Sequence, residues 1–251
     1  MCRNGLAARQ TSSGCSELTQ EQLDSKRFRR CLFQFQLAFL VSHEYTHHVH
    51  RHCGKSADWT WDEFTQAGAG GGLKHQAQEL DADGYALYLT LANYVRGAAR
   101  RNALSQVGMK NRSNLQGDEF LVTGFFVALT ALFCAMWPEN VPIASISQLP
   151  HPPAPVRIEY AIRVAIMWSG QNASVPESWF DADRFEAIYL AATAAIAGGA
   201  RSQWDALVAF LRSDAGKEYD RQLSEQFELV RKASEEAVQS DMSRSSAFAQ
   251  T

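Results

Sequence analysis

The sequence contains no paired cysteines, no cluster of basic residues and no clear strand pattern. Its cysteines are odd in number in a chain of 251 residues and form no CxxC pair: Cys2, Cys15, Cys31, Cys53 and Cys134. These features argue against a disulfide-stabilised fold and favour a reduced, intracellular protein. Lysine and arginine are scattered and the formal net charge is −3, so we expect no nucleic-acid partner.

Two segments of the sequence bear on the cellular localisation of the protein. Residues 1–20 are polar and contain no apolar stretch of the kind found in secretory signals, which favours the cytoplasm. Residues 120–137, in contrast, are nearly all apolar and reach the lower length limit of a membrane-spanning helix. Polar residues inside this segment and the absence of a basic cluster at either end favour a buried core helix. Membrane association through 120–137 is the alternative.

The remaining periodicity is helical almost throughout. Hydrophobic residues recur every three or four positions in the ranges 26–52, 59–67, 75–95, 156–168, 183–196, 203–211 and 218–238, with the glycine run 68–72 as a loop. Strand signals are scarce, so we predict a mainly α fold with little β structure. The expected organisation is a flexible segment at 1–25, a main domain at 26–170, a C-terminal helical support region at 171–240 and a disordered tail at 241–251.

One short motif carries the chemistry. His43-Glu44-Tyr45-Thr46-His47 is an HExxH sequence within a predicted helix that contains no proline or glycine at this point. Residues four apart lie one turn apart on the same helix face, so both imidazoles can bind one metal ion. Glu44 is rotated by about 100° from His43. It can therefore reach a water molecule on the metal and act as general base.

A catalytic zinc ion needs three protein ligands and one open position, so a third ligand must come from elsewhere in the chain. Glu79 lies on the predicted helix that follows the glycine loop, which lets this helix fold back onto the HExxH helix. Asp83 lies one turn further along the same face and can accept the second ring N–H of a ligating histidine. His75 is the alternative third ligand.

The other histidines near the motif are His48, His50 and His52. His50 shares the face of His43 and His47, but its Cα lies about 10 Å along the axis from His43, too far for the same tetrahedral site. We interpret these three side chains as exposed or as supporting the ligands, with an accessory metal site as the alternative.

HExxH followed by ExxxD resembles the gluzincin metallopeptidases. The later segment His151-Pro152-Pro153 with Arg157 is similar to the HP…R segment of the HtpX-like and CAAX-prenyl endopeptidases, and the Lit-type phage-exclusion peptidases also look like relatives. The resemblance covers roughly residues 43–163. It implies a zincin-like helical domain, and it places His151 and Arg157 near the active-site cleft.

The resemblance also implies roles for individual residues. His43, His47 and Glu79 match the Zn²⁺ ligands, Glu44 matches the catalytic base, and Asp83 matches the carboxylate behind the ligands. His151 and Arg157 are expected to hold substrate or to stabilise the tetrahedral oxyanion, because a cation there compensates the developing charge. The weaker oxyanion candidates are Tyr85, Tyr88 and Tyr160.

We therefore predict a zinc-dependent metalloendopeptidase that hydrolyses an intracellular protein with water activated by Glu44 on the zinc ion. If His151 and Arg157 belong to the same site as the zinc ligands, residues 120–137 cannot cross a membrane between them. One departure from the gluzincins favours an alternative function. No strand that could align a substrate precedes His43, so the chain is alternatively a zinc-binding pseudo-enzyme or regulatory protein with a truncated substrate-binding part.

Overall fold

The computed structural model describes residues 20–52, 72–96, 99–108, 114–136, 142–171 and 201–248, together with Asp183, Phe185, Glu186 and Leu190. Within these residues the elements are α1 (Gln20–Val49), α2 (Leu73–Leu91), a π-helical turn η2 (Ala92–Arg96), α3 (Ala99–Gln106), α4 (Asn114–Met136), a 3₁₀ turn η3 (Ile143–Gln148), α5 (Ala154–Gly170), α7 (Arg201–Arg212) and α8 (Asp214–Phe248). No strand occurs in the described part of the chain, which confirms the mainly α fold.

The predicted helices that fall within the described residues have counterparts there, with shifted ends. α1 begins six residues before the predicted start at residue 26, and the short helix α3 was not predicted. α8 continues to Phe248, into the segment for which a disordered tail was predicted, because no glycine or proline follows Gly216 to end it. The helix predicted at 59–67 lies outside the described residues, as does most of the helix predicted at 183–196.

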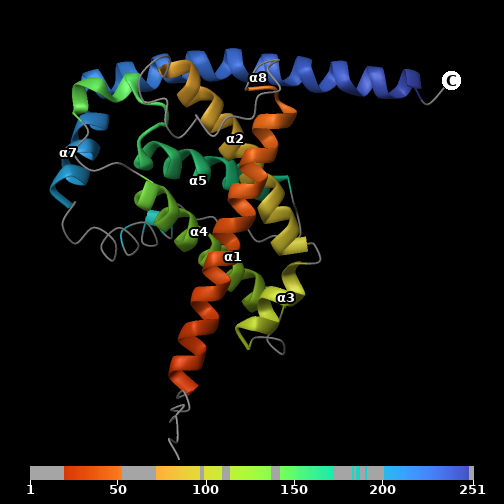
Figure 1. Cartoon of the computed structure of the whole chain (residues 1–251). Coiled ribbons are helices and arrows are strands. Elements are labelled where there is room, and N and C mark those ends of the chain that lie inside the picture. Colours follow the sequence, from red (N-terminus) through yellow and green to blue (C-terminus); the bar gives the residue numbers. More distant parts are fainter. Residues whose placement is uncertain are drawn as a thin grey trace, which may run out of the picture.

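α2 is the central element of the fold. It packs against α1, α5 and α8, and α4 in turn packs against α1 and α5 (Figure 1). α8 lies across the end of the bundle at which α1 terminates, and α7 packs against α8. The HExxH helix and the ExxxD helix therefore lie side by side, as the ligand argument requires.

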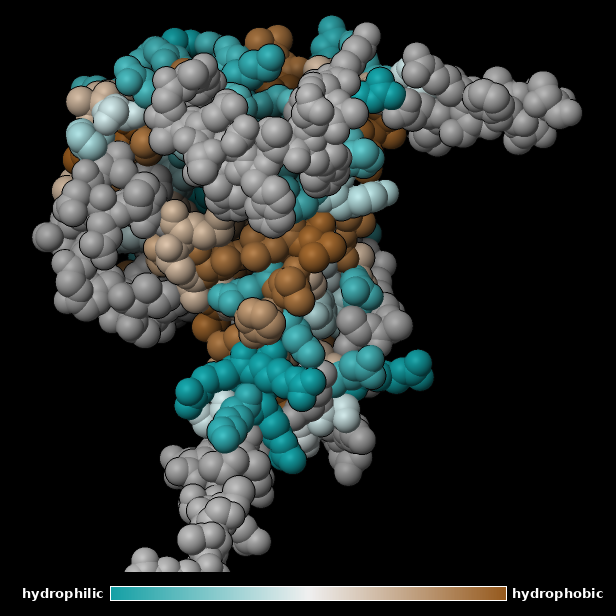
Figure 2. Space-filling view, viewed as in Figure 1, coloured by the Kyte–Doolittle hydropathy of each residue, from teal (hydrophilic) through white to brown (hydrophobic). Residues whose placement is uncertain are grey.

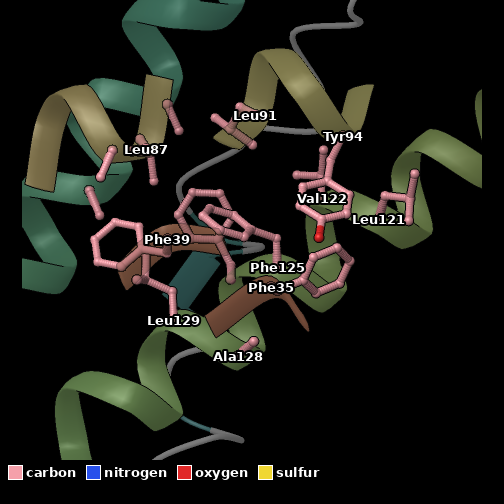
Figure 3. Close-up of a cluster of buried hydrophobic side chains, with 14 of the residues drawn as sticks. Phe35, Phe39, Leu87, Leu91, Tyr94, Leu121, Val122, Phe125, Ala128 and Leu129 are labelled. Atoms are coloured by element: carbon pink, nitrogen blue, oxygen red, sulfur yellow. The ribbon is translucent and has the colours of Figure 1, made fainter. Parts of the chain in front are cut away.

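The main hydrophobic core lies between α1, α2 and α4 (Figure 3). Phe35 and Phe39 of α1 are each 1% exposed, and the Phe35 ring meets that of Phe125 edge to face at 6.0 Å. Gly124 of α4 lets the two helices approach closely, since a Cβ there would lie 3.2 Å from the Phe35 ring. This packing fixes the part of α1 that leads into His43.

Much of α4 is buried in this core. Its buried side chains include Leu121, Val122, Phe125, Leu129 and Phe133. With a mean hydropathy of 2.0, the segment Glu119–Met136 is the one stretch among the described helices that is long and apolar enough to cross a membrane. In the structure, 50% of this segment is buried. Its packing against α1 and α5 agrees with the predicted core helix.

The opposite face of α1 carries hydrophobic side chains at intervals of four residues. Phe33, Leu37, Val41 and Tyr45 are between 49% and 62% exposed. In Figure 2 hydrophobic surface gathers around the middle of the visible face, above the hydrophilic start of α1. This stripe runs toward Glu44, which is also exposed.

A smaller core cluster joins α2 to α7 and α8 through Ala77, Leu80, Leu207, Tyr219 and Leu223. The buried Gln76 lies at its edge. Its amide donates hydrogen bonds to the carbonyl oxygens of Ile146 at 2.7 Å and Leu149 at 2.9 Å, and its Oε1 accepts one from the Tyr219 hydroxyl at 2.6 Å. These bonds fix the segment that leads to His151 against α2.

Candidate metal centre

The two histidines of the HExxH motif form one wall of a buried cluster. His43 and His47 are each 6% exposed, and their Nε2 atoms lie 3.0 Å apart. The Phe39 ring lies one turn earlier, with its centroid 6.0 Å from that of His43. The apolar face of α1 thus continues directly into the imidazoles and excludes water from their inner side.

Glu79 of α2 completes the cluster from the opposite side. Its Oε2 lies 3.3 Å from His43 Nε2, and its Oε1 lies 3.2 Å from His47 Nε2. A tetrahedral zinc ion with bonds of about 2.0–2.1 Å separates its ligand atoms by about 3.3 Å. The three side chains could therefore hold an ion of this size.

Unpaired polar atoms point to the same conclusion. His43 Nδ1, Glu79 Oε2 and His151 Nδ1 are buried without a well-aligned hydrogen bond, although each lies within about 3 Å of a polar neighbour. A buried polar atom without a hydrogen bond costs about 1–3 kcal/mol. A cation between His43, His47 and Glu79 would compensate this cost at the Glu79 carboxylate.

Asp83 lies behind His43 and is held by a buried arginine. Its Oδ1 lies 3.0 Å from His43 Nδ1, while Arg157 of α5 donates to both carboxylate oxygens at 2.7 and 2.6 Å. Both residues are almost fully buried, and the Arg157 guanidinium also lies 4.3 Å from the centre of the Phe133 ring. This arrangement orients the His43 ring from outside the ligand set.

The charges of the cluster are strongly coupled. Burial opposes protonation of His43, but the carboxylates of Glu79 and Asp83 outweigh it and raise its pKa to about 10. Burial also favours the neutral acid at Glu79 and Asp83. His43, with His151 and His47, nevertheless holds the pKa of the Glu79 carboxyl below its usual range, and Arg157 with His43 does the same for Asp83.

A cleft opens beside the cluster and gives access to it. Its lining combines the polar groups with hydrophobic side chains from α1 and α4: Phe39, Leu40, His43, Glu44, His47, Glu79, Leu132, Met136, His151 and Arg157. His151 is 36% exposed and its Nδ1 lies 2.9 Å from Glu79 Oε2. A neighbouring hollow shares Met136, His151 and Arg157 and extends along Leu149–Pro152.

The end of α1 brings a further histidine against His47. Arg51 adopts a left-handed φ of 57°, and the amides of Arg51 and His52 donate back to the carbonyls of His48 and His47. This is the Schellman pattern of a helix C-terminus, which reverses the chain over the last turn. As a result His52 Nδ1 lies 2.9 Å from His47 Nδ1.

A second polar cluster surrounds Asp81 on the other side of α2. Its Oδ2 lies 2.6 Å from His50 Nδ1 and 3.1 Å from His52 Nε2, and it accepts a hydrogen bond from the Ser234 hydroxyl of α8 at 3.1 Å. Hydrogen bonds with His50 and His52 outweigh burial and lower the pKa of Asp81. The side chains of His50, His52 and Asp81 could also hold a metal ion by composition and spacing.

The structure thus brings together the residues that the sequence singles out. His43, His47, Glu79, Asp83 and Arg157 form one contiguous cluster, with Glu44 and His151 at its open side. His75 is exposed on α2 and belongs to neither described metal-binding group. The tyrosines Tyr85, Tyr88 and Tyr160 do not line the described cleft.

Neither Asp81 nor Ser234 was assigned a role from the sequence. Asp81 lies two positions from both Glu79 and Asp83, which places it on the other side of α2. The nearby histidine run was a signal that a carboxylate partner exists. Ser234 follows more than 150 residues later on a helix of mixed polarity, and no local pattern could have connected it to the site.

Comparison with known families supports a peptidase. The family model described as Peptidase U49 matches residues 12–173, which include α1 through α5 and all the residues of the cluster around His43. α7 and α8 lie beyond the match. No curated protein and no solved structure gives a significant match to the chain.

Proposed function

Because the chain belongs to the peptidase U49 family, we propose that it is a zinc-dependent metalloendopeptidase related to the gluzincins. The observation that carries this proposal is the buried convergence of His43, His47 and Glu79 at separations of 3.0–3.3 Å, with Glu44 beside it on the open cleft. Two imidazoles and one carboxylate with an open side are a ligand set of catalytic zinc.

The same ligand types also hold non-haem iron, so the set alone does not identify the metal. The position of Glu44 favours zinc, because this carboxylate follows a ligand directly in the motif of zinc peptidases. Zinc, when bound by His43, His47 and Glu79, lowers the pKa of water and polarises the peptide carbonyl.

The chain's own groups then divide the proton transfers and the positioning. Glu44 is exposed at the cleft and takes the proton from the attacking water, then delivers it to the leaving amine. His151 lines the same cleft and is half-exposed, so it can donate to the oxygen on which negative charge develops. Arg157 contributes indirectly, because its guanidinium donates two hydrogen bonds to Asp83, which lies behind His43.

The walls of the cleft suggest the substrate class. Leu40 and Leu132 face the same cleft as Glu44, and Met136 joins it to the adjoining hollow. An apolar side chain beside the cleaved bond would bury its surface there, at about 25 cal/mol per Å². We propose a cytoplasmic protein substrate presented as a flexible segment with such a residue.

A second reading is supported by a specific observation. The described residues contain no strand that could align a peptide, so a zinc-binding pseudo-enzyme or regulatory protein is the alternative. In that case the purified chain would carry one zinc ion and leave a broad peptide library uncleaved.

The decisive experiment compares zinc content with cleavage in Glu44→Gln. This variant keeps the size of the side chain but not its basicity, so peptide cleavage should fall by roughly 10²–10⁴-fold while zinc remains bound. Glu159→Gln, an exposed carboxylate on α5, is the matched control and should cleave like the wild type. Undiminished cleavage by Glu44→Gln would refute the proposed role of Glu44.

A further inference from the structure

The two clusters on α2 differ in how well their polar atoms are satisfied. In the cluster of His43, His47 and Glu79, the buried atom Glu79 Oε2 has no aligned hydrogen bond. In the cluster of His50, His52 and Asp81, by contrast, no described side-chain atom is left unpaired. The first cluster thus has a carboxylate oxygen that a cation could pair with, whereas the polar atoms of the second pair with one another.

The contact between His47 and His52 decides how the second cluster works. Two nitrogen atoms 2.9 Å apart must share one hydrogen. If His47 binds the ion through Nε2, its Nδ1 carries the hydrogen and donates it. His52 Nδ1 must then be the acceptor, which requires the tautomer with hydrogen on Nε2.

Asp81 stabilises this tautomer of His52. Its Oδ2 lies 3.1 Å from His52 Nε2 and is fixed by His50 and by the Ser234 hydroxyl. The main chain contributes as well, because Gln78 donates to the His52 carbonyl at 3.2 Å. His52 is thus held from both sides, by the end of α1 and by α2.

The same geometry argues against a second metal ion. An ion bound to His52 Nε2 would displace the hydrogen to Nδ1, which then opposes the hydrogen on His47 Nδ1 across 2.9 Å. Two neutral imidazoles cannot satisfy both sites at once. Occupation of the His50 cluster would therefore weaken the cluster that faces the cleft.

We propose that His52 and Asp81 are positioning residues that hold His47 in the tautomer required for metal binding. The proposal rests on the proposed function, since it assumes an ion on His47 Nε2. Together with Asp83 behind His43, it gives each histidine ligand its own carboxylate-anchored partner: Asp83 directly, and Asp81 through His52.

The test measures Zn²⁺ binding by the full chain, with one ion expected per wild-type molecule. His52→Phe keeps a ring but removes the acceptor, so affinity in a chelator competition should fall by about 10–100-fold. His52→Gln retains an acceptor oxygen and should recover most of the loss, which also guards against a folding defect in the first variant. The exposed His75→Phe is the matched control and should bind like the wild type.

Nitrogen-15 NMR of histidine-labelled, zinc-loaded protein supplies a readout that a purely structural role would not move. His52 should carry its hydrogen on Nε2, and His47 on Nδ1. Two ions per wild-type chain, or hydrogen on His52 Nδ1, would overturn the proposal. One ion with unchanged affinity in His52→Phe would overturn only the role of His52, whereas a wild-type chain that binds no ion would overturn the proposed function itself.

Discussion

Replacement of Arg157 by methionine tests the electrostatic support of the site. Arg157 and Asp83 have side chains only 5% and 1% exposed, and two hydrogen bonds of 2.7 and 2.6 Å join them. Methionine fills much of the arginine volume beside Phe133 but removes the guanidinium from the buried Asp83 carboxylate, which keeps His43 as its neighbour. The variant therefore isolates the loss of charge pairing from the loss of packing.

The expected loss is large for a single substitution. Breaking a buried ion pair by removing one partner costs about 3–5 kcal/mol. For a chain of this size that corresponds to a fall in melting temperature of roughly 10 °C, at about 2–4 °C per kcal/mol. Asp83→Leu combined with Arg157→Met should lose less than Arg157→Met alone, because no charge then remains buried without a partner.

Urea unfolding followed by circular dichroism, with a chelator present throughout, measures this effect on the metal-free chain. Arg163→Met is the matched control on the same helix. Its side chain is 66% exposed and pairs with Glu159 on the surface, so the change should stay within about 0.5 kcal/mol. If Arg157→Met costs less than about 1 kcal/mol, or no more than Arg163→Met, the buried pair does not contribute as argued.

Three further predictions concern the helices that frame the site. Gln76→Leu leaves two carbonyls and the Tyr219 hydroxyl unpaired, so the free energy of unfolding in urea should fall by about 3 kcal/mol. Tyr219→Phe should lower it by about 1 kcal/mol, because only one of these bonds is lost. Equal losses in the two variants would contradict this prediction. Gly84→Ala would place a Cβ 2.7 Å from the Tyr160 hydroxyl and should lower the melting temperature, with partial recovery in combination with Tyr160→Phe; no recovery would exclude this contact as the cause. Burial raises the pKa of the Cys31 thiol to about 11 from 9.0, so the unfolded chain loses this proton first and stability should decline between pH 9 and 11. The decline should be shallower in Cys31→Ala, and parallel pH profiles of the two proteins would refute this assignment.

Local helix geometry was enough to predict that His43, His47 and Glu79 lie together. The spacing of His43 and His47, and of Glu79 and Asp83, fixes two helix faces without any knowledge of the tertiary structure. The glycine run between the two helices indicated that they could fold against each other. The mainly α class followed from the same periodicity, and it was confirmed by the described helices.

The parts that the sequence did not predict depend on contacts between distant segments. Arg157 was expected near the cleft from its motif, but its pairing with Asp83 depends on the approach of α5 to α2. The role of His52 depends on a left-handed residue at Arg51, and nothing in the sequence singles out this arginine for φ > 0, a conformation usual for glycine or asparagine. Of the two alternatives predicted for His52, exposed or supporting the ligands, its 4% exposed side chain excludes the first.

α2 explains why the proposed metal site and its support are built from so short a segment. Glu79 and Asp83 face α1, while Asp81, rotated by about 200° from Glu79, faces the end of α1 and α8. One helix can thus provide the ligand and both carboxylates behind the histidines, provided that other elements cover its two sides. α8 lies beyond the matched family region, yet its Ser234 hydroxyl contacts Asp81. We therefore expect Ser234→Ala to weaken Zn²⁺ binding slightly, because Asp81 loses a hydrogen bond, whereas the position of Glu44 should not change. A weaker Zn²⁺ affinity in this variant would connect the C-terminal helices to the site through Asp81.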